Sequence, residues 1–565
     1  MVHNVKGIEA ILSDGSVAWF CELEDRAVTG RYGEIVDGFR AIATREADEI
    51  RARFPRLLRR VAGYNLDIFD PQDPLRYNTT QPNMAHLLVG SEGTLAYFKR
   101  LTLKLSPLPK HKTLGVVNFP TFYRAMELTQ HIVKLDPSAV ELVDRTMIDL
   151  ARTNPSFQPI IDAALIGAPD AILLVEFSGD DAAEQTRKLD LLGSLLGDFG
   201  LPDSVVKLTN ASQRKSLWDV RKAGLNIMMS MKGDGKPVSF IEDCCVPLEH
   251  LADYTQRLSA VFEKHGTRGT WYAHASVGTL HVRPILNMKQ DGAEKMHAIA
   301  AEACELVREY KGVYSGEHGD GLVRSEWIAP FFGPRLTTAL AEVKQLFDPL
   351  NLMNPGKIVR PSKQDDRNLF RFKPDYRHID IKPALDWSAH GSLAHAAEMC
   401  NNNGHCRKFD ADVKCPSYRV TRDEQHSTRG RANTLRLALS GQLGADAMAS
   451  DAMRESFALC VSCKGCKREC PTGVDMAKMK IEYLHQHQQR HGLSTKDKLI
   501  AYLPRYAPYA AKFSRLLNLR DAIPRLAQWS EEKLGFSARR PLPKWRPDYF
   551  RVNQSRSDPA NGGRD

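Results

Sequence analysis

The sequence predicts a protein of class α+β, with α/β as the alternative, followed by a smaller helical domain rich in cysteine. Residues 113–360 alternate strand-like apolar runs with segments of helical period, which indicates helices layered on a sheet. A polar, charged and proline-containing stretch at 361–383 is typical of a linker. Seven of the eleven cysteines lie beyond that stretch, between residues 400 and 470, so the cysteine chemistry belongs to the C-terminal part of the chain.

The individual elements follow from local patterns. Residues 8–21 indicate two strands around an Asp14-Gly15 turn, because Asp-Gly is a preferred two-residue hairpin turn. Residues 84–105 place a glycine-rich loop between apolar, β-favouring segments. The central region predicts strands at 113–119 and 171–177 and helices at 123–133 and 182–196. Beyond the linker we expect helices around the cysteine loops, and then a tail rich in Pro and Arg.

Length and charge narrow the class of protein. The chain has 565 residues, enough for about three or four domains. No run of 18 apolar residues and no basic-then-apolar export signal is present, so we expect a cytoplasmic protein, with a position peripheral to the inner membrane as the alternative. Most of the net charge of +10 comes from residues 505–551, with eleven Lys and Arg against four Asp and Glu. No nucleic-acid reader motif accompanies this segment, so we expect a solvated or docking surface there.

The densest motif is the run Cys460, Cys463, Cys466 and Cys470, followed by Pro471. Four thiolates with spacers of two, two and three residues and a terminal Cys-Pro are typical of a [4Fe–4S] cluster. A zinc site would instead need two CxxC pairs separated by a longer segment. A disulfide framework does not fit eleven cysteines in a chain of this length without a secretory signal. The run therefore predicts electron transfer.

A second, incomplete set of cysteines precedes the first. Cys400, Cys406 and Cys415 follow the same plan, but Asn403 stands at the second ligand position and the last spacer is eight residues long. An amide is a poor substitute for a thiolate on soft iron, so a second cluster is less strongly predicted than the first.

Two ligand assignments stay open for these cysteines. In two-cluster ferredoxins the fourth cysteine of each run ligates the other cluster. This cross-ligation would join Cys415 to the first three cysteines of the later run. It would leave Cys400, Cys406 and Cys470 for a three-iron or labile second centre. The local alternative gives Cys470 to the first cluster.

A second constellation lies in the central region. His274 and His281 are seven residues apart across a glycine-containing segment, and Glu317 stands next to His318. Two imidazoles and a carboxylate can hold a divalent metal while leaving positions open for a substrate oxygen, and His318 could then act as a base. The alternative is that these histidines are structural groups.

Several motifs in family order resemble the FAD-linked oxidases of vanillyl-alcohol-oxidase type, a family that includes D-lactate, glycolate and D-2-hydroxyglutarate dehydrogenases. These motifs are the Leu-Val-Gly-Ser-Glu-Gly-Thr-Leu segment at 88–95, the His-x6-His and Ser-Gly-Glu-His-Gly motifs, and the Asn-Pro-Gly-Lys signature at 354–357. Residues 415–431 resemble the opening of glycolate-oxidase-type iron–sulfur subunits. The fusion of both parts is similar to bacterial FAD/iron–sulfur D-2-hydroxyglutarate dehydrogenases.

The resemblance implies a fold, cofactors and site residues. It implies part of an FAD-binding domain, a ferredoxin-like α+β oxidase domain and a helical ferredoxin-type domain. It implies FAD near Gly63, Tyr64, Gly90, Ser91, Glu92, Gly93, Thr94, Leu95 and Asn354. It further implies zinc or manganese on His274, His281 and Glu317, with His318 as base and Arg221 as clamp for a substrate carboxylate. Arginine suits that role because its planar fork pairs bidentately.

Departures from the family pattern bear on the substrate. Arg283 stands where the family has Asn, and an extra guanidinium favours a second carboxylate on the substrate. Ile241 stands where the family has a basic residue, so Lys236 is the candidate replacement. We therefore expect D-2-hydroxyglutarate, with D-lactate or glycolate as alternatives, and a protein or quinone as electron acceptor. A homo-oligomer is compatible with the pattern.

The motifs divide the chain and place it within a longer relative. We expect an FAD-domain segment at 1–106, an oxidase domain at 107–362, a linker at 363–393, a cluster domain at 394–492 and a basic tail at 493–565. The family's pyrophosphate loop and its further cysteine repeats have no counterpart here, which suggests truncation at both ends. The competing interpretation is an electron-transfer or assembly module, or an inactive fragment, without dehydrogenase activity of its own.

Overall fold

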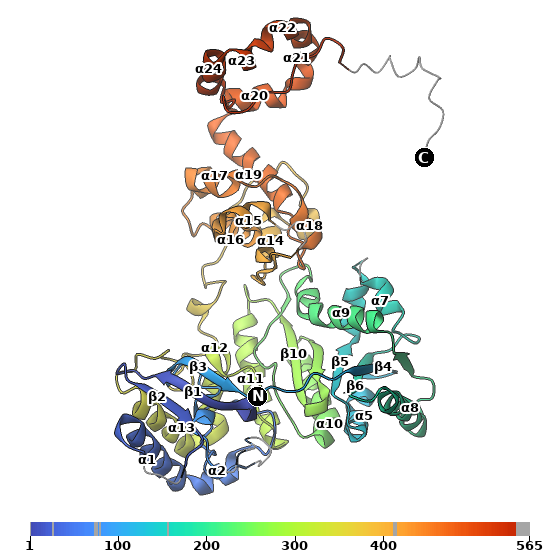
Figure 1. The fold of residues 1–565 in the computed structure, drawn as a ribbon, viewed down its shortest axis with the longest axis vertical. Coiled ribbons are helices and arrows are strands. Elements are labelled where there is room, and N and C mark those ends of the chain that lie inside the picture. The colour runs from blue at the N-terminus through green and yellow to red at the C-terminus, as the bar shows by residue number, and fades with distance from the viewer. Residues whose placement is uncertain are drawn as a thin grey trace.

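The computed structural model describes residues 2–24, 28–72, 77, 79, 81–154, 157–410 and 415–549. Residues 550–565 of the expected tail lie outside this part. In Figure 1 the chain forms a large mixed body, a helical domain above it and a further group of helices at the far end. Within the described part, no helix combines the length and the apolar character that a membrane span needs.

The N-terminal body is a three-stranded antiparallel sheet of order β2-β1-β3, formed by β1 (Val5–Ile11), β2 (Val17–Cys21) and β3 (Tyr97–Leu103). The expected hairpin is confirmed: the turn contains Gly15 with φ of +84°, and Leu12 N donates to Ser16 O at 2.9 Å. Helices α1 (Gly30–Arg45), α2 (Ala47–Arg53) and α4 (Ala85–Leu88) accompany the sheet. Phe347, far along the chain, stacks on Phe20 with ring centroids 5.9 Å apart.

The central domain is a seven-stranded sheet of order β7-β4-β6-β5-β9-β10-β8, in which every pair is antiparallel. Its strands are β4 (His111–Phe119), β5 (Ala139–Asp144), β6 (Ala171–Gly179), β7 (Val205–Leu208), β8 (Lys236–Pro237), β9 (Gly269–His274) and β10 (Thr279–Leu286). The antiparallel pairing confirms class α+β, because α/β folds rest on parallel strands joined by crossover helices.

Helices cover both faces of this sheet. Its helices are α5 (Phe122–Ile132), α6 (Arg145–Arg152), α7 (Gln158–Asp162), α8 (Ala182–Asp198), α9 (Ala211–Met229), α10 (Leu251–Lys264) and α11 (Gly292–Glu309). The helices α12 (Gly321–Arg324) and α13 (Ile328–Phe347) follow, and α13 packs against α1 of the N-terminal body. Along β6, Leu173 and Val175 join the core shared with α5, α8 and α10, whereas Ile172 and Leu174 join the core under α6 and α9. Both faces are therefore apolar, which explains the continuous hydrophobic run of this strand.

The cysteine domain, by which we mean α14 to α19, has its own small core around Leu435, Phe457 and Tyr483. Its helices are α14 (Leu393–Glu398), α15 (Pro416–Thr421), α16 (Thr428–Leu439), α17 (Asp451–Ala458), α18 (Gly465–Glu469) and α19 (Met476–His491). The stretch at 361–383 forms no α-helix or strand, as expected of a linker.

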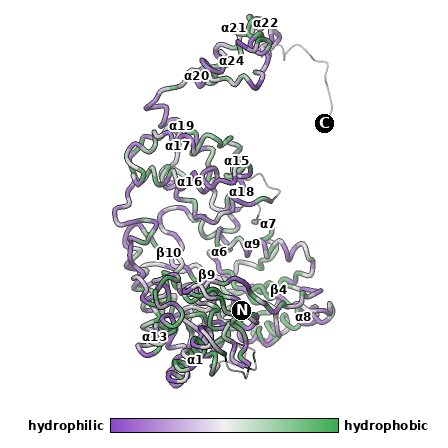
Figure 2. The backbone as a smooth tube through the Cα atoms, turned by 60° about the vertical axis from the view of Figure 1, so that its left-hand side comes forward, coloured by the Kyte–Doolittle hydropathy of each residue, from purple (hydrophilic) through white to green (hydrophobic). Residues whose placement is uncertain are grey.

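The C-terminal segment differs from the tail that its composition suggested. It forms α20 (Thr495–Ala501), α21 (Leu503–Ala510), α22 (Ser514–Leu517), α23 (Leu519–Ala522) and α24 (Pro524–Leu534). Many apolar side chains on these helices are exposed, Tyr509 and Leu516 among them. Figure 2 shows hydrophobic and hydrophilic stretches alternating along this part of the trace. Proline at the first turns of α21 and α24 is compatible with a helix, because that position needs no intrahelical N–H bond.

Candidate functional site

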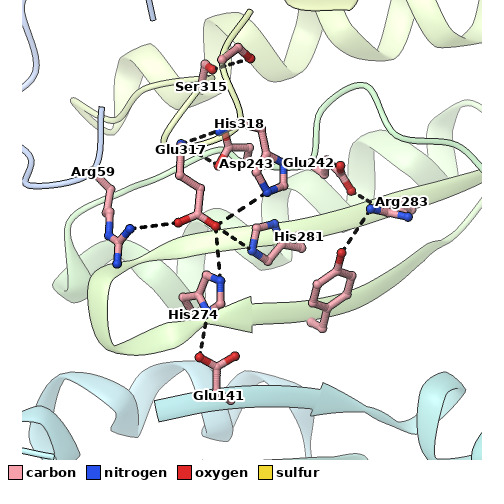
Figure 3. Close-up of polar contacts among 12 residues, drawn as sticks. Arg59, Glu141, Glu242, Asp243, His274, His281, Arg283, Ser315, Glu317 and His318 are labelled. Carbon is pink, nitrogen blue, oxygen red and sulfur yellow. Dashed lines mark hydrogen bonds and ion pairs between the residues drawn. The ribbon is translucent and has the colours of Figure 1, made fainter. Parts of the chain in front are cut away.

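The predicted histidines and Glu317 meet at one point in the central domain (Figure 3). His274 ends β9 and His281 lies on the paired strand β10, where the register places His281 opposite Tyr272. Glu317 and His318 come from the loop that follows α11. The ring centroids of His274 and His281 are 4.9 Å apart, and those of His281 and His318 are also 4.9 Å apart.

One carboxylate oxygen is the centre of this cluster. Glu317 Oε1 lies 3.2 Å from His274 Nε2, 3.4 Å from His281 Nε2 and 3.6 Å from His318 Nε2. Ligand atoms about 2.1 Å from a tetrahedral zinc ion are about 3.4 Å from each other. The separations therefore fit atoms that would share one ion. His281 Nε2 is the ring nitrogen that faces Glu317, so it is the atom of this residue that would bind the ion.

Only part of the charge in the cluster suits a cation, because a metal ion would have to displace the proton that the raised pKa keeps on His274. Hydrogen bonds to Glu141 and then to Glu317 raise the pKa of His274 to about 9. Burial raises the pKa of Glu317, but the hydrogen bonds from His274 and His281 outweigh it and leave the pKa well below its ordinary value. Burial lowers the pKa of His281, which favours the neutral imidazole that metals bind.

Residues that sequence reasoning missed hold the metal-binding candidates in place. Glu141 Oε1 lies 2.6 Å from His274 Nδ1, an arrangement that fixes the tautomer and orientation of a ligating histidine. Arg59 Nη1 lies 3.1 Å from the second oxygen of Glu317. Asp243 accepts the backbone N–H groups of Glu317 at 2.9 Å and His318 at 2.8 Å. Asp243 is close enough to be a ligand itself, but these bonds occupy its oxygens. We therefore infer that Asp243 holds the loop of Glu317 and His318 in position.

His318 is held from its other side. Glu242 Oε1 lies 3.5 Å from His318 Nδ1, and the hydrogen bond between them raises the pKa of His318. Burial raises the pKa of Glu242, but the His318 hydrogen bond and the charge of Arg283 lower it to about 2. Glu242 thus remains a carboxylate that orients His318, while His318 Nε2 faces the cluster.

The two predicted arginines stand on either side of Tyr272. The guanidinium of Arg221 lies 4.8 Å from the ring centroid of Tyr272, and that of Arg283 lies 5.7 Å from it. Arg221 Nη2 donates to Glu141 at 2.6 Å, and Arg283 bonds Glu242 and the Tyr272 hydroxyl. Each arginine already has a carboxylate partner, so only its remaining N–H groups are left for a substrate. These partners could not be read from the sequence.

Lys236 lies near Arg283 but not in the histidine cluster. Both line a cavity of ≈ 440 Å³ that is also lined by Asn226 of α9, Arg371 of the linker and Asn403 of the cysteine domain. Lys236 Nζ donates to Met231 O, and burial lowers the pKa of its amine. The cavity therefore connects the predicted substrate side of the central domain with the cysteine domain.

The residues predicted to bind flavin are linked to the histidine loop. Tyr64 OH and Thr94 Oγ1 are 2.6 Å apart, and Asn354 Nδ2 donates to Glu92 O at 2.7 Å. The Glu92 carboxylate accepts the backbone N–H of Asp320 at 2.6 Å. Gly63 N in turn donates to Asp320 Oδ2 at 2.7 Å. A displacement of one loop would therefore displace the other.

The loop at 90–95 has the features of a phosphate cradle. Gly90 and Gly93 have φ of +84° and +69°, a region that glycine adopts without strain, and no atom would meet a Cβ on Gly93. Ser91 Oγ is buried without a hydrogen-bond partner in the described part of the chain, so a donor is left for a ligand oxygen. Leu95 is fully buried beneath the loop. These residues fit the predicted flavin group.

Asp320 supplies a pH-dependent test of this linkage. Burial raises its pKa to about 7, far above the value of about 3.9 in an unfolded chain. Between these values the folded state keeps the proton that the unfolded chain releases, so stability falls as pH rises, by up to about 1.4 kcal/mol per pH unit. Asp320→Asn is expected to remove this dependence. The unfolding midpoints of the unmutated chain and of Asp320→Asn should therefore differ in their dependence on pH between pH 5 and 8. The same pH dependence in both proteins would contradict the raised pKa of Asp320.

The first cluster set is brought together across the cysteine domain. Cys415, at the start of α15, lines one small cavity with Cys460, Cys463 and Cys466. Cys470 does not line that cavity; its Sγ lies 3.4 Å from Thr472 Oγ1. The arrangement fits a cluster ligated by Cys415 rather than by Cys470. The remaining cysteines, Cys400, Cys406 and Cys470, are left as the second set.

Comparisons with known proteins find two families of domain in the chain. Residues 108–358 match the family of FAD linked oxidases, C-terminal domain, and residues 396–474 match the 4Fe-4S dicluster domain. The chain is 30% identical over 538 residues to D-2-hydroxyglutarate dehydrogenase of Escherichia coli (strain K12), which covers 85% of this chain and 51% of that protein.

Two further relatives match the chain at a similar identity, one of them over only half of its length. The D-2-hydroxyglutarate dehydrogenase of Pseudomonas putida is 29% identical over 90% of this chain and 53% of that protein. The D-lactate dehydrogenase of Archaeoglobus fulgidus is 30% identical over 50% of this chain and 59% of that protein. The chain spans about half the length of the D-2-hydroxyglutarate dehydrogenases it matches. The domain matches support FAD and an iron–sulfur cluster as cofactors, and the chain joins a C-terminal domain of the FAD linked oxidases to a 4Fe-4S dicluster domain.

Proposed function

We propose that the chain carries the catalytic and electron-exit parts of an FAD-dependent D-2-hydroxyacid dehydrogenase, with D-2-hydroxyglutarate as the substrate and 2-oxoglutarate as the product. The observation that carries this proposal is the convergence of three imidazole nitrogens on Glu317 Oε1, next to Arg221 and to the loop of Glu92. The names of the relatives in Escherichia coli and Pseudomonas putida support the same substrate.

Each residue has a role that its surroundings favour. His274, His281 and Glu317 would hold zinc or manganese, and Gly90, Ser91 and Gly93 would cradle FAD. When bound, the metal would polarise the substrate hydroxyl and the flavin would accept the hydride. His318 Nε2 takes the hydroxyl proton, and Glu242 stabilises the charge that this transfer places on the ring.

The arginines orient the substrate. Arg221 offers the N–H groups that Glu141 does not occupy to the carboxylate next to the reacting carbon. Arg283 and Lys236 line the neighbouring cavity, where they can receive a second carboxylate. Lys236 and the N–H groups of Arg283 that Glu242 does not occupy favour a dicarboxylate over D-lactate or glycolate, because a methyl group or a hydrogen atom could not accept hydrogen bonds from them. Electrons leave through the cysteine domain to a protein or quinone acceptor.

The test compares substrates and arginine variants of the full chain supplied with FAD and metal, using an artificial acceptor. Arg221→Gln is expected to lower kcat/KM for D-2-hydroxyglutarate by about 100-fold or more, as a charged hydrogen bond of about 1.5–3 kcal/mol and its orientation are lost. Arg283→Gln is expected to lower the preference for D-2-hydroxyglutarate over D-lactate. Lys222→Gln is the matched control, because Lys222 is exposed on the same helix and pairs with Asp219.

Equal use of D-2-hydroxyglutarate and D-lactate by the unmutated chain would contradict the dicarboxylate assignment. The second candidate function is an electron-transfer or assembly module, favoured by the cysteine domain having a core of its own. Purified chain with the broad iron–sulfur absorbance, no bound flavin after incubation with FAD and no dehydrogenase activity would favour that module.

A further inference from the structure

A buried arginine lies against the cavity of the first cysteine set. Arg431 on α16 is 1% exposed, and its Nη1 lies 3.7 Å from Cys415 Sγ. Its other nitrogens donate to Ser456 O at 2.7 Å and to Ser417 Oγ at 3.1 Å. No carboxylate pairs with Arg431 among the residues that the structure describes. A guanidinium enclosed in this way lacks the counter-charge that buried cations normally have.

A second arginine lies beside the other set, which it contacts through a backbone carbonyl and not through a sulfur atom. Arg371, in the linker, donates from Nη1 to Cys400 O at 2.9 Å. Its Nε and Nη2 are buried and have no hydrogen-bond partner within the described ranges.

An iron–sulfur cluster on these cysteines would supply the negative charge that the two arginines lack. Thiolates bound to iron and the sulfides of a cluster together carry net negative charge, and reduction adds one electron to it. Positive charge and N–H donors directed at the sulfur atoms stabilise the reduced form, which raises the reduction potential. Water would screen the effect, but a buried guanidinium acts through a medium of lower polarity.

We propose that Arg431, which is buried, and Arg371, which is partly buried, are the counter-charges of two iron–sulfur centres and set their reduction potentials. Arg431 serves the centre at Cys415, Cys460, Cys463 and Cys466, and Arg371 serves the centre at Cys400, Cys406 and Cys470. Arg371 also lines the cavity that contains Arg283, so its centre is the one next to the oxidase domain. The inference concerns the cysteine domain and goes beyond the proposed dehydrogenase reaction, so it does not depend on the substrate.

The experiment is a dithionite titration of the anaerobically reconstituted full chain, followed by EPR, in which each centre accepts one electron. Arg431→Gln is expected to move the midpoint potential of one signal to a more negative value and to leave the other unchanged. Arg371→Gln is expected to do the reverse, and Arg431→Lys should shift its signal less than the Gln variant does. Arg454→Gln is the control, because Arg454 is an exposed arginine of the same domain that pairs with Asp451.

The outcomes separate an electrostatic role from a structural one. An unchanged midpoint in Arg431→Gln with full iron content would overturn the proposal, as would equal shifts of both signals in either variant. Iron loss in Arg431→Gln but not in Arg431→Lys would support a requirement for the charge. Iron loss in both Arg431→Gln and Arg431→Lys would overturn the electrostatic role, because it would show that the cluster depends on the packing of the arginine side chain and not on its charge. A single EPR signal in the unmutated chain would overturn the part that concerns Arg371.

Discussion

Replacement of Glu317 by Gln is expected to abolish tight binding of zinc or manganese. Glu317 Oε1 is the atom within 3.6 Å of all three imidazole Nε2 atoms, so it provides the anionic ligand around which the site is built. Loss of a supporting residue around a metal site typically costs 10–100-fold in affinity, so loss of a ligand should cost more than about 100-fold. Calorimetric titration of metal-free full chain with zinc or manganese measures this directly.

The control for this variant is Glu302→Gln. Glu302 Oε1 also contacts a histidine, His265, at 2.7 Å, and Lys264 adds a second cation, but this pair lies outside the candidate site. Its removal should leave metal stoichiometry and affinity unchanged. The Glu317→Gln protein should remain folded, because the amide can still accept from Arg59. Stoichiometric metal in both variants with equal affinity would return the histidine cluster to a purely structural role.

The predictable part of the site is the part that lies in short motifs. His274 and His281 lie on the two strands of one hairpin, and Glu317 is followed directly by His318, so spacing and residue type selected them as candidates, with a structural role as the alternative. Glu141 could not be selected, because it reaches His274 only through the pairing of β5 with β9, more than 130 residues away along the chain. Glu242 could not be selected for the same reason, because it lies 41 residues from Arg283 along the chain.

In the fold, too, elements with strong local signals were predicted and contacts between distant segments were not. The Asp14-Gly15 hairpin and the strand at 113–119 have strong local signals and form as expected. The packing of Phe347 on Phe20 has no local signal, because it joins the end of α13 to the N-terminal sheet. The helices from α20 to α24 were not predicted, because Pro504, Pro508 and Pro524 interrupt the segment and its apolar residues are largely exposed. Periodic burial, the usual sequence signal of a helix, is therefore weak there.

Replacement of Cys415 by Ser is expected to remove the first iron–sulfur cluster as completely as Cys463→Ser does. The two residues are 48 positions apart, yet both line the cavity that Cys460 and Cys466 complete. A serine hydroxyl binds soft iron weakly, so a cluster with one serine should be lost or oxidatively labile. The measurements are iron and sulfide per chain and the broad visible absorbance of the purified protein.

Cys470→Ser distinguishes the two ligand assignments that the sequence leaves open. If Cys415 is the fourth ligand, Cys470→Ser spares the first cluster and affects only the centre that involves Cys400 and Cys406. Cys21→Ser, in the N-terminal sheet, controls for the loss of a thiol elsewhere. The local assignment predicts the opposite pattern, in which Cys470→Ser removes the first cluster and Cys415→Ser does not. Since Cys470 lies next to Thr472 and outside the shared cavity, we expect the loss of the first cluster to follow Cys415.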